Sequence, residues 1–151
     1  MLLLEGKTLS NKILDALPER IAAVSARAGR PPALALVNYF ADSPSAVYVK
    51  RKLAACGKLG IRATLINPEA GAGLAGFLKL LEELSADAAI DAVMIERPLP
   101  AGFEVPAMWD AIPPQKDVDA LSSVNMGRLF IPKAMADIER ASRMQGVGFV
   151  K

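Results

Sequence analysis

The sequence contains no histidine and only one cysteine, Cys56, and these two shortages limit the chemistry available to the protein. Without histidine there can be no Ser-His-Asp triad, no imidazole general base and no histidine-containing zinc site. A single cysteine excludes an internal disulfide framework and a multi-cysteine metal site. Any acid–base chemistry must therefore come from lysine, tyrosine, aspartate or glutamate.

The sequence also lacks the features of nucleic-acid-binding and membrane proteins. Its formal net charge is only +2, and no basic run alternates with aromatic residues, so no nucleic-acid partner is expected. No apolar run approaches the ~20 residues that span a bilayer, and the opening M-L-L-L-E is too short and too soon charged for a signal peptide. We therefore expect a cytoplasmic protein that has no membrane partner.

Motifs that bind nucleotide phosphates are missing as well. No G-x-G-x-x-G follows a predicted strand, and no G-x-x-x-x-G-K-[ST] occurs, so dinucleotides and nucleoside triphosphates have no evident cradle. The sequence does have 151 residues, of which 52% are hydrophobic, and this is enough for one sizeable core. We expect one domain that has neither a cofactor site nor a metal site of its own.

The order of the periodic segments predicts an α/β fold. Three short apolar segments alternate with helical patterns and begin roughly 30 residues apart, as in a βαβαβ unit with right-handed crossovers. We expect a three-layer sandwich in which helices flank a mainly parallel sheet. The predicted strands span residues 33–38, 61–67 and 91–96, and the predicted helices span residues 8–28, 44–59 and 74–84. Pro18 is expected to kink or split the first of these helices.

The last third of the chain is predicted to contain shorter elements. Pro106 opens a short helix that runs to Ile112, and K-D-V-D at residues 116–119 is an acidic loop heading back toward the sheet. A turn is expected at residues 122–127, a short edge strand near residues 128–131 and a final helix from Pro132. We assign residues 1–131 to one domain and residues 132–151 to a C-terminal helix and tail.

The helix after the first strand carries the leading candidates for chemistry, Tyr48 and Lys52. Asp42 and Ser43 are suited to cap it, and an apolar stripe formed by Ala46, Val49, Leu53 and Cys56 faces the core. Tyr48 and Lys52, one turn apart, belong to a second stripe that begins at Ser45. An isolated Y-x-x-x-K is common and usually marks a surface aromatic residue beside a solvated charge.

Position in the sheet strengthens these candidates. Ligands of open α/β sheets bind beyond the carboxyl ends of the strands. The third strand ends there at Glu96, and the helix bearing Tyr48 and Lys52 begins at the same edge. For Asp117 and Asp119, spacing alone favours turn formation or capping.

Several segments, taken together and in order, resemble a known enzyme family. They are L-E-G-K from Leu4, S-A-V-Y-V-K-R-K from Ser45, C-G-K-L-G from Cys56, D-A-V-M-I-E-R-P-L-P from Asp91, K-D-V-D from Lys116 and N-M-G-R-L from Asn125. This pattern resembles the N-terminal folate-binding domain of bifunctional methylenetetrahydrofolate dehydrogenase/cyclohydrolase. That family interconverts methylene-, methenyl- and 10-formyltetrahydrofolate in one-carbon metabolism, which supplies purine biosynthesis.

The resemblance implies a role for each matching residue. Lys52 resembles the catalytic lysine, and Glu96 stands beside it at a second catalytic position. Tyr48 resembles the tyrosine that stacks on the folate aminobenzoyl ring, and Asp119 resembles the aspartate that hydrogen-bonds the pterin. Pro98 and Leu99 match the substrate-binding P-L-P segment. The implied ligands are tetrahydrofolate derivatives.

Three departures from the family pattern qualify that expectation. The first is at the end of the third strand, where Glu96 stands for the family's glutamine and Arg97 for its leucine. The second is the replacement, around Phe40, of the usual glycine before the Tyr–Lys helix. Glu96 as a carboxylate favours the charged form of Lys52 and opposes base function, unless Arg97 neutralises Glu96 instead. Both arrangements stay open at this point.

The third and largest departure is the absence of the Rossmann domain that binds NAD or NADP in the family. This chain alone is expected to perform at most the cyclohydrolase step and no hydride transfer. The alternative is a catalytically inactive folate-binding or assembly module that has kept the fold. Both a monomer and a homodimer are compatible with the sequence.

Overall fold

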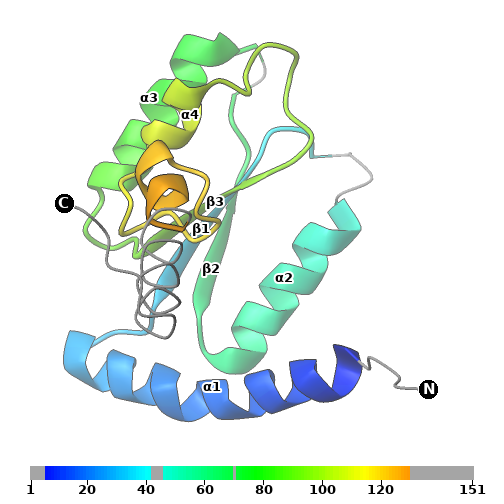
Figure 1. The fold of residues 1–151 in the computed structure, drawn as a ribbon, viewed down its shortest axis with the longest axis vertical. Coiled ribbons are helices and arrows are strands. Elements are labelled where there is room, and N and C mark those ends of the chain that lie inside the picture. The colour runs from blue at the N-terminus through cyan, green and yellow to red at the C-terminus, as the bar shows by residue number, and fades with distance from the viewer. Residues whose placement is uncertain (1–5, 42–45, 70, 130–151) are drawn as a thin grey trace, which may run out of the picture.

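The computed structural model describes residues 6–41, 46–69 and 71–129, and within them it confirms the predicted α/β fold (Figure 1). Each of the three predicted strands is present to within one residue at either end. The elements in order are α1 (Gly6–Ala28), β1 (Ala33–Asn38), α2 (Ala46–Leu59), β2 (Arg62–Ile66), α3 (Gly73–Ala86), β3 (Ala92–Glu96) and α4 (Pro106–Asp110).

The three strands form one parallel sheet in the order β2-β1-β3. Leu34 of the central strand pairs with Ala63 on one side and with Ala92 on the other. Helices cover both faces, α2 on one and α3 with α4 on the other, which gives the predicted three layers (Figure 1). Because all strands run the same way, their carboxyl ends lie together at one edge of the sheet.

The main core lies between the sheet and the α3 and α4 layer. Alternate strand residues point into it, because successive side chains of a strand face opposite sides. They pack on Phe77 and Leu81 of α3, both fully buried. The buried cluster consists of Ala35, Val37, Phe77, Leu81, Val93, Ile95, Phe103, Met108 and Ile112.

Helix α2 turns its predicted apolar stripe toward the other face of the sheet. Val49 is buried, and Ala46, Leu53 and Cys56 are half-buried. The helix stops at Gly60, whose φ of 76° is left-handed, and the Ile61 N–H then donates to the Cys56 carbonyl over 2.9 Å. The predicted caps Asp42 and Ser43 lie outside the described residues.

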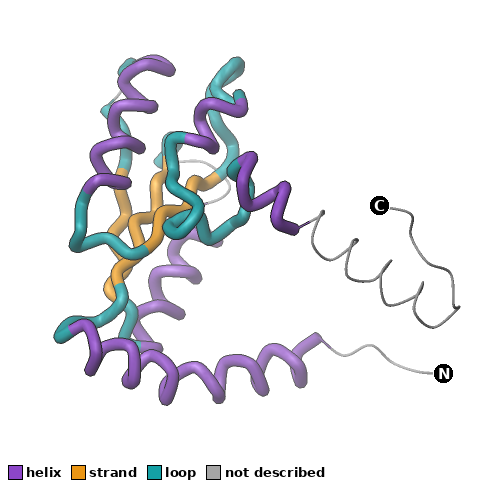
Figure 2. Tube along the Cα trace, turned by 60° about the vertical axis from the view of Figure 1, so that its left-hand side comes forward, coloured by secondary structure: helices purple, strands orange, loops and turns teal. Residues whose placement is uncertain are grey.

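Helix α1 lies across the amino ends of the strands, and none of its residues is buried (Figures 1 and 2). Pro18 was expected to kink or split this helix; it does not split it, because the helix is continuous from Gly6 to Ala28, and Figure 2 shows the helix gently bowed. The carbonyl of Leu14, freed by the proline, belongs to an exposed residue and can be solvated by water.

Two predictions for the C-terminal third are also wrong. Residues 123–129 are helical, so they form neither the expected turn nor the expected edge strand at Arg128 and Leu129. The Ser122 carbonyl accepts from the Met126 N–H over 2.9 Å, and its hydroxyl accepts from the Asn125 N–H over 3.4 Å, which starts the helix. Residues 130–151 lie outside the described residues, including the predicted final helix and the boundary at residue 131.

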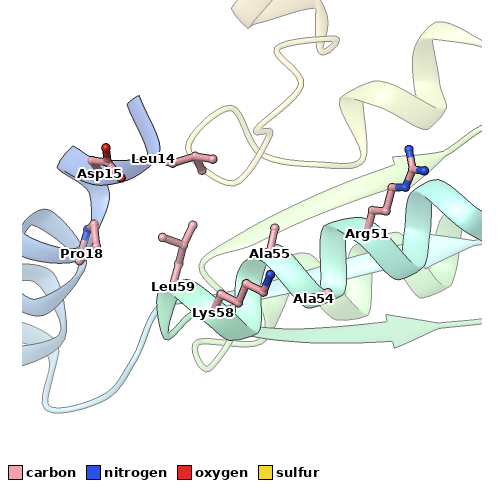
Figure 3. A pocket seen from close by; sticks show the side chains of 8 residues that line it. All are labelled: Leu14, Asp15, Pro18, Arg51, Ala54, Ala55, Lys58 and Leu59. Atoms are coloured by element: carbon pink, nitrogen blue, oxygen red, sulfur yellow. The ribbon is translucent and has the colours of Figure 1, made fainter. Parts of the chain in front are cut away.

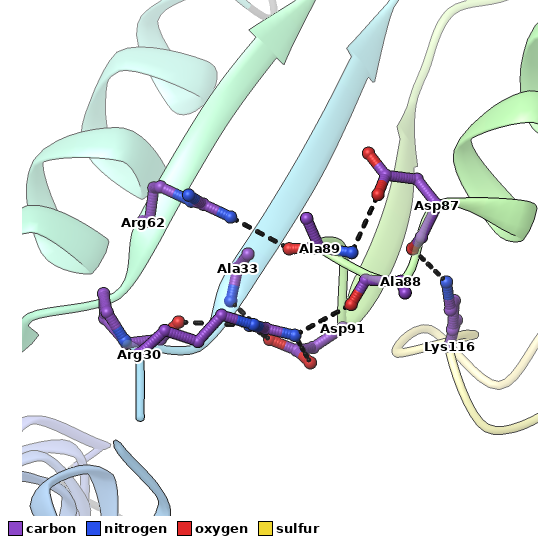
Figure 4. Close-up of polar contacts among 9 residues, drawn as sticks. Arg30, Ala33, Arg62, Asp87, Ala88, Ala89, Asp91 and Lys116 are labelled. Carbon is purple, nitrogen blue, oxygen red and sulfur yellow. Dashed lines mark hydrogen bonds and ion pairs between the residues drawn. The ribbon is translucent and has the colours of Figure 1, made fainter. Parts of the chain in front are cut away.

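A polar cluster ties the amino ends of β1 and β3 together (Figure 4). Arg30 donates to both carboxylate oxygens of Asp91, over 2.6 and 2.8 Å, and Asp91 also accepts from the Ala33 N–H. Arg62 reaches the Ala89 carbonyl over 2.9 Å and Lys116 reaches the Asp87 carbonyl over 2.7 Å. We call this group the amino-end clasp.

Candidate active site

The candidate site lies at the carboxyl edge of the sheet, on the face that α2 covers. Asn38 and Glu96, the last residues of β1 and β3, are register partners. Met94 and Glu96 both contact Lys52 of α2, so alternate residues of β3 face that helix. Helix α2 starts at this edge and runs back along the sheet, which brings its first two turns over the strand ends (Figure 1).

Lys52 and Glu96 form an ion pair at the centre of the site. The Glu96 side chain is only 7% exposed, whereas that of Lys52 is 43% exposed. A buried carboxylate without a partner would be strongly unfavourable, so Lys52 is the group that allows Glu96 to be ionised here. The Lys52 Nζ also lies 3.5 Å from the Met94 sulfur, a weak acceptor.

Asp119 comes to the same place from the loop after α4. It is exposed at the rim, and its pKa is raised from the usual value. Loss of solvation is the largest cause, the Lys52 charge opposes it, and the charges of Glu96 and Asp117 add to it. The three side chains Lys52, Glu96 and Asp119 therefore interact electrostatically in one site.

Asp117 holds the loop that carries Asp119, which matches the turn-forming role that spacing favoured. Its carboxylate accepts from the N–H groups of Leu121 and Ser122 and from the Asn125 side-chain amide. Partial burial raises its pKa, but these hydrogen bonds outweigh burial and leave the pKa lowered. An isolated parallel bridge between Val93 and Asp117 sets the loop against β3.

Tyr48 lies one turn before Lys52 on α2 and is 62% exposed. The guanidinium of Arg51 lies 6.0 Å from the centre of its ring. Of the two residues expected to bind substrate after β3, Pro98 is exposed, whereas Leu99 packs against the core. The structure thus gathers Lys52, Glu96 and Asp119, with Tyr48 open to a ligand and Leu99 turned toward the interior.

The structure decides between the two arrangements left open for Arg97. Its guanidinium pairs with Glu104 over 2.6 Å and lies 5.9 Å from the centre of the Trp109 ring. Glu96 pairs with Lys52 instead. Arg97 therefore does not neutralise Glu96, and of the two arrangements left open the structure shows the one in which Glu96 pairs with Lys52.

Aromatic rings fix the rim on the opposite face of the sheet. Tyr39, which follows β1, contacts Phe40, Phe77 and Phe103 edge to face, with ring centres 5.1, 5.8 and 5.3 Å away. Phe103 belongs to the loop after β3, so the cluster joins the ends of two strands. Phe40, at the position where a glycine was expected from the family pattern, lies partly exposed beside it.

A separate cavity of about 590 Å³ lies between α1 and α2 (Figure 3). It contains neither Tyr48 nor Lys52, and is lined by Leu14, Asp15, Pro18, Arg51, Ala54, Ala55, Lys58 and Leu59. Among residues 6–41, 46–69 and 71–129 there is no cluster of potential metal ligands. In the same part of the chain, no helix combines the length and apolar character needed to cross a membrane.

The family model for the catalytic domain of tetrahydrofolate dehydrogenase/cyclohydrolase matches residues 4–119, which include every residue of the site. The chain belongs to this family. It is 37% identical over 145 residues to the bifunctional protein FolD of Elusimicrobium minutum, covering 96% of this chain and 49% of that protein. It is 39% identical over 127 residues to FolD of Aromatoleum aromaticum, covering 84% and 43%.

Solved structures of the family show the same architecture. The bifunctional FolD enzyme of Campylobacter jejuni superimposes with a TM-score of 0.76 at 30% identity, covering 85% of this chain and 45% of that one. A methylenetetrahydrofolate dehydrogenase of the silkworm Bombyx mori gives 0.77 at 27% identity, covering 95% and 51%. The chain thus spans about half the length of the family members it matches.

The sequence analysis missed one residue of this site, Asn38. It was assigned to a buried strand and given no further role, yet it ends β1 beside Glu96 and is 2% exposed. The signal was available, since a polar residue ends an otherwise apolar run at the edge of the sheet where ligands bind.

Proposed function

We propose that this chain binds tetrahydrofolate derivatives at the carboxyl edge of its sheet and performs the cyclohydrolase step of one-carbon metabolism. The observation that carries the proposal is the meeting of Lys52, Glu96 and Asp119 beside the open ring of Tyr48. Family membership supplies the substrate class. We further propose that the protein works in the cytoplasm and serves purine biosynthesis.

The side chains suit a flat, hydrogen-bonding ligand. The exposed Tyr48 ring offers a face on which an aromatic part of the substrate can stack. Asp119, whose pKa is raised, is placed to exchange hydrogen bonds with an amino–pyrimidine edge. Lys52, one turn after Tyr48 on α2, is paired with the buried Glu96.

In the proposed reaction, water adds to the methenyl carbon and loses one proton, and one carbon–nitrogen bond then breaks. The freed nitrogen keeps the bonding electrons and takes up a proton, while the added hydroxyl loses its proton, so the carbon becomes the formyl group of 10-formyltetrahydrofolate and one proton is released overall. Lys52 is the group placed to pass protons between water and substrate. Glu96, paired with Lys52, holds the lysine nitrogen at the floor of the site.

Hydride transfer is outside this proposal. The dehydrogenase reaction needs NAD or NADP, and we propose that its binding requires the Rossmann portion of the full-length family members. We also leave a homodimer as a proposal for the full-length context, since the α1 face exposes Leu9, Ile13 and Leu14.

One observation favours a second candidate, an inactive folate-binding or assembly module. A lysine tied to a buried carboxylate is a poor base, and Glu96 is placed to hold Lys52 in this way. Under this reading the site binds folate and does not turn it over. The two candidates therefore differ in catalysis and agree on binding.

Calorimetric titration of tetrahydrofolate into the purified protein tests the shared claim. We expect saturable binding, weakened about three- to tenfold in Tyr48→Leu, because one aromatic contact is lost. Val47→Leu is the matched control, since Val47 is the similarly exposed neighbour of Tyr48 on α2. Wild-type protein that takes up no tetrahydrofolate at millimolar concentration would refute the proposed function.

A further inference from the structure

The floor of the site contains a polar atom that nothing in the described part of the chain satisfies. Asn38 is almost fully buried, and its carboxamide oxygen has no hydrogen-bond partner among these residues. Native proteins pair the large majority of buried side-chain oxygens. An apolar residue of similar size would avoid this cost, so the asparagine calls for a functional explanation.

The sheet places this oxygen next to the Lys52–Glu96 pair. Asn38 and Glu96 are partners in parallel register, and neighbouring strands lie about 4.8 Å apart. Register partners point to the same face of a sheet, and Glu96 points toward α2 and Lys52. Asn38 therefore points to that face as well, with its amide beside the carboxylate.

We propose that Asn38 is a positioning residue for Lys52, and that its carboxamide oxygen is a second acceptor for the lysine ammonium beside Glu96. An ammonium has three donors, and here one is directed to Glu96 and another only to the Met94 sulfur. Lys52 is partly exposed on a flexible four-carbon stem, and the proposed contact requires a side-chain rotation that takes its nitrogen from β3 toward β1.

Two acceptors on adjacent strands would fix the direction of the amine as well as its charge. If substrate or water engages Glu96, Asn38 still holds the amine on the floor of the site. This consequence for turnover rests on the proposed function, whereas the contact itself does not. Among the described residues, the titratable groups that interact with Lys52 include Glu96 from β3 and Asp119 from the loop after α4, and Tyr48 lies one turn before it on α2.

The contact can be tested without any turnover. Protein carrying ¹³C-labelled lysine is titrated by NMR, and Lys52→Met identifies the Lys52 signal. In Asn38→Leu we expect the midpoint of the Lys52 titration to fall by up to about one pH unit, the equivalent of one hydrogen bond to the charged form. Asn38→Asp should raise the midpoint, because a carboxylate is a stronger acceptor for an ammonium.

Asn67→Leu is the matched control, because Asn67 follows β2 at the same edge of the sheet but is exposed. It should leave the Lys52 midpoint unchanged. An Asn38→Leu protein whose Lys52 titrates as in the wild type would overturn the proposal. Asn38→Ala gives the same comparison in a smaller side chain if leucine prevents folding.

Kinetics add a second readout. Asn38→Leu should lower kcat for methenyltetrahydrofolate hydrolysis about tenfold, the rate equivalent of one hydrogen bond, with KM changed by less than about twofold. Its thermal stability should not fall, since an unpaired buried oxygen is removed. Unchanged kcat, or a loss confined to stability, would mean that Asn38 is only structural.

The two proposals can fail separately. A wild-type protein that does not bind tetrahydrofolate removes the proposed function, but the Lys52 midpoints still decide whether Asn38 contacts the lysine. A protein that hydrolyses its substrate with identical midpoints in Asn38→Leu and wild type keeps the proposed function and removes the role of Asn38.

Discussion

The two ends of the sheet use polar side chains in opposite ways. At the amino end, the clasp directs Arg30, Arg62 and Lys116 to backbone carbonyls and to Asp91, and each contact joins neighbouring segments (Figure 4). At the carboxyl end, Glu96 is buried under a single lysine and the Asn38 oxygen has no partner among the described residues. The polar groups of the clasp are paired within the chain, whereas at the carboxyl end the Asn38 oxygen is left unpaired among the described residues.

The polar groups at the amino end therefore serve stability, and those at the carboxyl end serve ligand binding, although the two ends are only one strand length apart. Groups satisfied within the chain gain nothing from a ligand, whereas an unpaired amide and a lysine with a free donor gain new partners when one binds. The K-D-V-D segment connects the two ends, since Lys116 belongs to the clasp, Asp117 bridges to Val93 and Asp119 lies in the site. Variants at the amino end should therefore change stability, and variants at the carboxyl end should change folate binding and turnover.

The largest effect is expected at the carboxyl end, from Lys52→Met. This variant keeps the length of the side chain and removes its proton, so hydrolysis of methenyltetrahydrofolate should fall about 10²- to 10⁴-fold. Lys79→Met is the matched control, because Lys79 is an exposed lysine of α3 paired with Glu83 over 3.7 Å. Steady-state absorbance assays of both variants make the comparison.

Equal activity in Lys52→Met and wild type would remove Lys52 from the mechanism. Wild-type turnover no faster than the buffer reaction, together with normal folate binding, would favour the inactive module.

A smaller effect is expected from Glu96→Gln, which replaces the carboxylate under Lys52 with a neutral amide of the same shape. Because the amide still accepts a hydrogen bond from the Lys52 amine, the position of Lys52 is kept while the charged partner that opposes base function is removed, and hydrolysis should rise about tenfold. Glu83→Gln, which breaks the exposed pair with Lys79, controls for loss of an ion pair alone. Hydrolysis rates measured across the neutral pH range give the result.

An unchanged rate in Glu96→Gln would indicate a site that has lost its chemistry for other reasons. A fall in rate would show that the carboxylate itself takes part in proton transfer.

Much of this fold could be predicted from local sequence. The strand Ala33–Asn38 is a short apolar run between turn residues, and it is buried as such runs usually are. The helix at residues 123–129 was missed because its start depends on side-chain hydrogen bonds of Ser122 and Asn125, including those to Asp117 in the preceding loop. Side-chain contacts of this kind leave no periodic pattern in the sequence.

The candidate site was likewise predicted from the sequence only in part. The alternation of strands and helices along the chain predicted that Glu96 and the Tyr48–Lys52 helix lie at one edge of the sheet. The structure brings Lys52 to Glu96 there. Sequence could not decide which cation pairs with Glu96, since Lys52 and Arg97 were both near enough in principle. The choice follows from geometry, because Arg97 faces away toward Glu104 and Trp109.

The smallest effect is expected at the amino end, where Asp91→Asn weakens the clasp and leaves the site intact. The hydrogen bond from Arg30 is the main cause of the lowered pKa of Asp91, with the Ala33 N–H and the Lys116 charge also lowering it and partial burial opposing them. A depressed pKa contributes stability that is present above the unfolded-state value of 3.8 and is lost as pH falls through the folded-state value. The wild type should therefore be more stable than Asp91→Asn at neutral pH, by a modest margin because both side chains of the pair are partly exposed.

Urea unfolding of both proteins at a series of pH values should show this margin shrinking below pH 3.8. Asp15→Asn, on the exposed surface of α1, is the control for a general change of charge. Folate binding should be the same in all three proteins, and a loss of binding in Asp91→Asn would show that the two ends of the sheet are not independent.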